Sequence, residues 1–271
     1  SCVRGTDYVA RLGGDEFAIL LKGIRDAEIA RRIADSIVTA RLYPLNPRIA
    51  FRDWTVNESN YVAYDMNKNL FKASMTVNSA DKSLIKLYTD RDGLFHNGIN
   101  AELAGIELRD WLVLSPFAPP IDGTLSGNAK INFNEQYYWG DCCVRVDRMS
   151  YGKKLVGNLD LDAKIAMTDD ATKTYALADM ELDGKEIMTL RGMKNDSLPT
   201  SEYNLDIAIK RLPLSRASAF LPDGTGDMTG YLNGSMKVVG PEINPSINGY
   251  LQFDTAQVRI QNYGSALTFD G

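Results

Sequence analysis

The segment NLDLDAKIAM, residues 158–167, alternates apolar and polar side chains almost without exception. Successive side chains of a β-strand point to opposite faces of a sheet, so this spacing predicts a strand with one apolar face. The same alternation recurs in residues 71–77, 125–133, 205–209 and 247–253. The sequence therefore predicts a mainly β protein whose strands each present a single apolar side.

Turn-forming clusters separate these segments. They are residues 90–93 (DRDG), 168–170 (TDD), 183–185 (DGK) and 240–242 (GPE). Short strands joined by such turns are typical of antiparallel neighbours, and long helical patterns are nearly absent. We therefore expect a long antiparallel β-meander.

One stretch of the chain occurs twice. GTLSGNAKI, residues 123–131, aligns with GYLNGSMKV, residues 230–238, at an offset of 107 positions. Each copy follows an apolar, helix-compatible piece that ends in proline, at residues 108–116 and 217–222. The repeat predicts a unit of one helix and two strands that has been used twice.

The composition narrows the classes of function. The 271 residues are 44% hydrophobic and 24% charged, with a formal net charge of −5. The acidic excess argues against a nucleic-acid partner, which would require a basic face. Three cysteines and a single histidine, His96, offer neither a disulfide framework nor a zinc ligand set. No apolar run approaches the roughly 20 residues that a membrane-spanning helix needs.

The first forty residues have a different pattern. Two strand-like runs flank Gly13 and Gly14, which predicts a β-hairpin. Asp15 and Glu16 follow, and such carboxylates are the hard oxygen ligands that magnesium prefers. Asp26 then precedes a helical pattern whose isoleucines share one face.

Residues 1–41, which include RGTDYVARLGGDEFAILL, resemble part of a GGDEF domain, the diguanylate cyclase family that condenses two GTP molecules into cyclic di-GMP. The resemblance implies that Gly13 and Gly14 border the nucleotide, that Asp15 binds magnesium and that Glu16 supports the active half-site. Arg4 and Asp7 match the RxxD motif that grips a guanine of cyclic di-GMP.

The family's first strand, with the aspartate that completes its metal site, is not found in residues 1–41. A hairpin and one helix cannot preorganise two metals and two nucleotides. We therefore expect no diguanylate cyclase activity and no cofactor; Mg²⁺ and GTP would bind only if the fragment were completed.

Residues 42–271 resemble a second family. The resemblance lies in residues 226–234, 245–253, 53–57 and 112–127, which are similar to recurring patterns of TamB and its AsmA-like relatives. The resemblance implies a β-taco, an antiparallel sheet curled around a lengthwise hydrophobic groove in the periplasm of a Gram-negative cell envelope. It also implies a role in phospholipid transport or outer-membrane protein assembly, with an outer-membrane barrel as partner.

Ten alternating residues are the predicted lining of that groove, where they would contact phospholipid acyl chains: Leu125, Ile131, Leu159, Leu161, Ile165, Leu232, Met236, Val238, Leu251 and Phe253. One-sided strands also build an ordinary β-sandwich with a sealed core, and alternation by itself favours that architecture. The repeat and the scarcity of charges on the alternating face favour an open groove.

The sequence thus predicts a GGDEF-like fragment over residues 1–41 and a β-taco segment over residues 42–271. The leading functional hypothesis is a lipid-conduit or assembly module of the envelope. The alternative is a protein that synthesises or senses cyclic di-GMP, in which the β-region is a binding sandwich.

Overall fold

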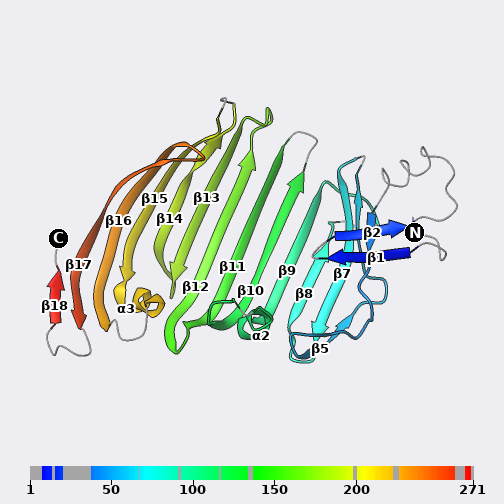
Figure 1. Cartoon of the computed structure of the whole chain (residues 1–271), viewed down its shortest axis with the longest axis horizontal. Helices are drawn as coiled ribbons and strands as arrows, with labels where there is room; N and C mark the ends of the chain where they lie inside the picture. Colours follow the sequence, from blue (N-terminus) through cyan, green and yellow to red (C-terminus); the bar gives the residue numbers. More distant parts are fainter. Residues whose placement is uncertain are drawn as a thin grey trace.

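The computed structural model describes residues 8–13, 16–20, 38–66, 68–90, 93–115, 117–133, 137–197, 200–221, 226–259 and 266–269. Within these residues, sixteen strands form one antiparallel sheet and two more form a separate hairpin (Figure 1). The predicted mainly β, open antiparallel fold is confirmed. The described strands from β3 to β18 all belong to one open sheet, whereas the alternative sandwich would divide them between two packed sheets.

The N-terminal hairpin consists of β1 (Tyr8–Gly13) and β2 (Glu16–Leu20), which pair antiparallel as predicted. The helical pattern that begins at Asp26 lies outside the described residues.

The large sheet is a meander. Each strand from β7 to β17 pairs antiparallel with the next one along the chain, through short turns in most cases and through helical connections before β10 and β16. At the N-terminal end, β5 and β6 both pair with β7, β4 pairs with β5, and β3 pairs with β6. The strands are β3 (Val38–Ala40), β4 (Arg48–Ile49), β5 (Arg52–Val56), β6 (Tyr61–Asp65), β7 (Leu70–Ser79), β8 (Leu84–Tyr88), β9 (Gly98–Glu107), β10 (Ile121–Phe133), β11 (Tyr138–Tyr151), β12 (Lys154–Met167), β13 (Lys173–Leu182), β14 (Lys185–Asn195), β15 (Glu202–Pro213), β16 (Asp227–Pro241), β17 (Ser246–Arg259) and β18 (Ala266–Phe269).

Short helices lie along one long edge of the sheet, at the bottom of Figure 1. Helix α2 (Leu108–Leu112) precedes β10, while α3 (Leu214–Ala217) and the 3₁₀ turn η1 (Ser218–Phe220) precede β16. The two copies of the sequence repeat therefore have the same local structure, a helical piece followed by a long strand. No helix in the described residues combines the length and apolar character needed to cross a bilayer.

The repeat also places two equivalent glycines at β-bulges. Gly123 and Gly230 have φ values of 139° and 89°, and the strand register shifts at both positions. A Cβ at Gly123 would meet Val146 Cγ1 at 2.9 Å, and one at Gly230 would meet the Thr255 carbonyl oxygen at 2.5 Å. Only glycine fits such a bulge, which bends its strand and increases the local twist.

Neighbouring strands carry matching irregularities. Arg148 and Arg211 have positive φ values of 51° and 45°, and each lies at a register shift. The Arg148 amide donates to Asn158 Oδ1 at 2.9 Å, and the Arg211 amide donates to Asn233 Oδ1 at 2.8 Å. These side-chain acceptors replace ladder bonds that the bulges interrupt, so the sheet bends near the helix edge without leaving those amides unpaired.

Candidate functional site

One face of the sheet carries apolar residues in rows that run across the strands. Paired residues of adjacent strands share a face, so each row follows directly from the register. The central row has eleven positions on successive strands from β7 to β17: Met75, Leu87, Ala101, Ala129, Cys142, Ala163, Ala178, Leu190, Ile207, Met236 and Gly249.

Two more rows flank the central one. The helix-side row lies nearer the edge that carries α2 and α3, and the turn-side row lies nearer the opposite edge. The turn-side row is Ile99, Ile131, Gly140, Ile165, Ala176, Gly192, Leu205, Val238 and Ile247. The helix-side row is Val56, Val77, Ile85, Leu103, Gly127, Val144, Leu161, Met180, Met188, Ile209, Gly234 and Leu251. We call these three the groove rows, and none of their positions is charged.

A hollow of about 440 Å³ lies over the groove rows between β8 and β14. Its floor is the small-residue part of the central row, and larger side chains border it, including Ile131 and Ile165 on the turn side and Leu87 and Leu190 at the two ends. Seven strands spaced by about 4.8 Å span roughly 29 Å from the first to the last. The hollow is therefore long, shallow and almost entirely apolar.

The helix edge closes one long side of this face. Leu214 of α3 and Ala219 of η1 are buried, and Ala219 belongs to a cluster with Val156, Leu182 and Ile187. Tyr151 and Phe220 stack in a tilted arrangement with their ring centroids 5.1 Å apart. Packing of this kind fixes the short helices against the strand ends.

A second cluster closes the N-terminal end of the helix-side row. Trp54 is 1% exposed and packs with Val56, Val77 and Ile106. Its Nε1 donates to the Ile49 carbonyl oxygen at 3.0 Å, and its ring meets Trp111 of α2 edge-on with centroids 6.0 Å apart. The indole thus fills the end of the groove while its one polar atom is satisfied.

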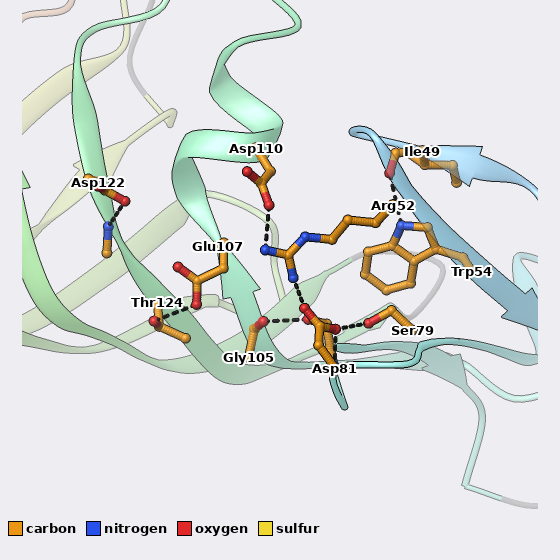
Figure 2. Close-up of polar contacts among 12 residues, drawn as sticks. Ile49, Arg52, Trp54, Ser79, Asp81, Gly105, Glu107, Asp110, Asp122 and Thr124 are labelled. Atoms are coloured by element: carbon orange, nitrogen blue, oxygen red, sulfur yellow. Dashed lines mark hydrogen bonds and ion pairs between the residues drawn. The ribbon is translucent and has the colours of Figure 1, made fainter.

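An ion-pair network holds the Trp54 cluster against α2 (Figure 2). Arg52 pairs with Asp81, in the β7–β8 turn, and its Nη2 lies 2.5 Å from Asp110 Oδ2 in α2. Asp81 also accepts from the Ser83 amide at 3.2 Å, and the Ser83 hydroxyl donates to the Gly105 carbonyl oxygen at 2.6 Å. One arginine therefore links three elements that are distant in sequence, because its two terminal nitrogens contact two different carboxylates.

The opposite long side of the groove is polar at its C-terminal part. Lys194, which follows the turn-side row on β14, lies 3.2 Å from Asp196 and 3.3 Å from Glu242. These carboxylates raise the pKa of Lys194, with Asp196 the larger cause. Tyr203 donates to Glu242 at 3.1 Å, and this contact raises the pKa of the tyrosine. The groove thus runs between a charged rim and the helix edge.

The other face of the sheet carries the charges. Arg145 pairs with Asp160 at 3.0 Å and Lys237 with Asp206 at 3.2 Å, each across adjacent strands. Such exposed pairs are screened by solvent and contribute little to stability, so their main effect is to keep this face hydrated. The adjacent cysteines show the same division between faces. Cys142 lies in the central groove row, whereas exposed Cys143 contacts Asp162, which raises the pKa of its thiol.

All ten predicted groove residues lie on the apolar face. Six belong to the groove rows: Ile131, Ile165 and Val238 on the turn side, Met236 in the centre, and Leu161 and Leu251 on the helix side. The other four lie one step nearer the helix edge, where Leu125 and Leu159 pack against the two buried clusters and Leu232 pairs with Phe253. The hollow itself is lined by only two of the ten, Ile131 and Ile165.

Several residues that line the hollow were not predicted. They are mostly small or occur on short strands: Leu87, Ile99, Ala101, Ala129, Gly140, Cys142, Ala163, Ala176, Ala178 and Leu190. Alanine and glycine give weak hydrophobic periodicity, so their role depends on which residues lie opposite them. The signal that could have found Ala163 was its place within the alternating segment 158–167.

The predicted nucleotide site falls mostly outside the described residues, which exclude Arg4, Asp7, Gly14 and Asp15. Gly13 and Glu16 are described, and they pair at the end of the β1–β2 hairpin where the chain passes from one strand to the other, after a register shift. In the residues that the structure covers, no cluster of three or more potential metal ligands is present.

Comparison with known proteins finds a family match at the N-terminal end. The family model for the diguanylate cyclase GGDEF domain matches residues 1–86. That range is about a third of the chain, and it extends beyond residue 41, through β4–β7 and into β8. No curated protein and no solved structure matches the chain. The N-terminal part of the chain, which includes the first strands of the long sheet, is therefore similar to a GGDEF domain.

Proposed function

We propose that the long sheet binds the acyl chains of phospholipids in its open groove and serves as a segment of a lipid-conduit or assembly module of the bacterial envelope. The observation that carries this proposal is the set of groove rows, which keep an uncharged surface in register across successive strands from β7 to β17. Part of that surface is open to solvent, since Ile165 is 38% and Leu251 53% exposed.

The energetics favour a hydrocarbon ligand over water. Each methylene buried on such a surface gains about 0.8 kcal/mol, so a partly covered acyl chain binds usefully. A ligand that lies across the strands would follow the hollow over roughly 29 Å of sheet. Its head group would remain in water beside the polar rim, where Lys194 and Tyr203 lie. This role requires positioning alone and no catalytic residue.

The resemblance of residues 42–271 to TamB and AsmA-like proteins supports the same function. It also suggests the setting, the periplasm of a Gram-negative bacterium, and an outer-membrane barrel as a partner. Large exposed apolar surfaces on soluble proteins usually mark a binding site, which agrees with this role.

The test is lipid extraction followed by mass spectrometry. Protein purified without harsh detergent should carry phospholipid, and Leu161→Asp or Leu232→Asp should reduce the bound amount, because a carboxylate at either position would lose hydration to the lipid chain. Thr189→Asp is the matched control, since Thr189 pairs with Asp179 and Ala208 on the opposite face. Absence of lipid from well-folded native protein would refute the proposal.

A second candidate function, binding or synthesis of cyclic di-GMP, is favoured by the GGDEF family match over residues 1–86. We propose that residues 1–41 form no product from GTP and magnesium, because a hairpin and one helix cannot preorganise two metals and two nucleotides. Product formation that Asp15→Ala abolishes would contradict this expectation. Calorimetry with cyclic di-GMP, compared with an Arg4→Ala variant, tests binding separately.

A further inference from the structure

Side-chain size along the central groove row changes twice. Met75 and Leu87 are large, and Leu190 on β14 begins a second run of large residues. Between Leu87 and Leu190, five successive strands contribute small side chains: Ala101, Ala129, Cys142, Ala163 and Ala178. In the flanking rows, small residues occur singly or in one pair. The run of five is therefore specific to the central row, where it forms the floor of the hollow.

Larger side chains enclose this floor on all sides. Ile131 and Ile165 border it on the turn side, and Leu161 of the helix-side row lies on the other side. Leu87 and Leu190 lie across its two ends. The groove rows contain no charged residue, so the space between these side chains suits an unbranched hydrocarbon that lies across the strands.

The length of the floor and the volume of the hollow give the same ligand size. Five strands spaced by about 4.8 Å span roughly 19 Å from the first to the last. Each carbon–carbon bond of about 1.5 Å advances an extended acyl chain by roughly 1.3 Å, so the floor matches a chain of about fifteen carbons. A methylene group fills roughly 30 Å³, about the volume of a water molecule in the liquid, so the hollow of about 440 Å³ holds about fifteen of them.

We infer that the hollow is a length-selective site for a single acyl chain of about fifteen carbons, with Leu87 and Leu190 as its two ends. The inference rests on the proposed lipid-binding function and adds the chain length to it. A longer chain must rise over one of the leucines, which moves its last methylenes from the floor into water. Each methylene that loses its cover weakens binding by up to about fourfold. The second chain of a phospholipid does not fit into the same hollow.

Two substitutions move one end of the hollow in opposite directions. Ala101→Leu places a leucine one strand further inside, and Leu87→Ala extends the floor by one strand towards Met75. One strand spacing of about 4.8 Å corresponds to about four carbons, so the preferred chain should shorten by about four carbons in the first variant and lengthen by about four in the second. Glu102→Leu and Lys86→Ala are the matched controls, since Glu102 and Lys86 pair with each other on the opposite face.

Lipid uptake from vesicles of mixed chain length measures the preference. The whole chain is incubated with phosphatidylcholine vesicles that contain equal amounts of saturated chains from about twelve to about twenty carbons, a range that brackets the expected length. Lipid that re-isolates with the protein is analysed by mass spectrometry, and thermal melting shows that each variant is folded. We expect the native protein and both control variants to enrich chains of about fifteen carbons.

Two kinds of failure are distinguishable. Native protein that binds lipid with the chain-length distribution of the vesicles would overturn the length selection and leave lipid binding intact. The same conclusion would follow if folded Ala101→Leu and Leu87→Ala variants enriched the same chains as the native protein. Native protein that takes up no lipid of any length would instead refute the proposed function, and the length selection with it.

Discussion

Ala129 and Cys142 are direct antiparallel partners on β10 and β11, and both line the hollow on the groove face. The same row continues through Ala163 and Ala178. Small side chains at these positions set the depth of the hollow, while the isoleucines beside them form its wall. The shape of the groove therefore depends on the aligned small residues that form its floor as well as on the large apolar residues that border it.

Filling the hollow should displace lipid without unfolding the sheet. We expect Ala163→Phe to lower the amount of co-purified lipid several-fold, because the ring would occupy the acyl-chain position above the floor. Asn128→Phe is the control, as this exposed residue is the partner of Cys143 on the opposite face. Mass spectrometry and thermal melting measure both effects. Unchanged lipid content in folded Ala163→Phe protein would argue against the hollow as the binding site.

The adjacent cysteines should respond differently to lipid and to pH. Bound lipid should protect Cys142 from maleimide and leave Cys143 reactive, since the two thiols lie on opposite faces. Asp162 raises the pKa of Cys143, which lowers its thiolate population at a given pH. Asp162→Asn should therefore shift the reaction profile of Cys143 to lower pH. Peptide mapping after timed alkylation resolves the two sites; equal protection of both would contradict the assignment of faces.

Removal of the buried Trp54 side chain should destabilise the fold strongly. Trp54→Ala deletes a side chain that is 1% exposed and is expected to cost about 3–5 kcal/mol of unfolding free energy. Trp139→Ala, at a site that is 41% exposed, should cost far less. Denaturant unfolding followed by circular dichroism measures the difference. Similar midpoints for the two variants would show that the Trp54 cluster does not anchor the end of the sheet.

The bulge glycines should tolerate alanine less well than a turn glycine does. Gly184→Ala introduces only the cost of a left-handed alanine, about 1 kcal/mol, because a Cβ there meets nothing within 4 Å. Gly230→Ala has in addition the clash with Thr255 and should cost roughly 1–3 kcal/mol more. Equal unfolding free energies for the two variants would exclude a steric role for the bulge.

The sequence predicted which side chains share a face better than it predicted where the hollow lies. Leu161 and Met236 were assigned correctly to the apolar face, because the period of a strand is two regardless of its neighbours. Ala101 and Ala178 were not recognised, since an alanine becomes a groove floor only when other small residues lie opposite it. That alignment depends on register, which turns and bulges set.

The sequence by itself determined the strand content, the apolar face and the repeated unit at Gly123 and Gly230, since these follow from local periodicity and glycine conformation. The choice between an open sheet and a sealed sandwich was decided only by tertiary structure, because both architectures require the same alternation. In the described residues, each strand from β7 to β17 pairs with its successor within one sheet. These strands therefore extend the sheet side by side and do not start a second sheet over Leu161 and its neighbours.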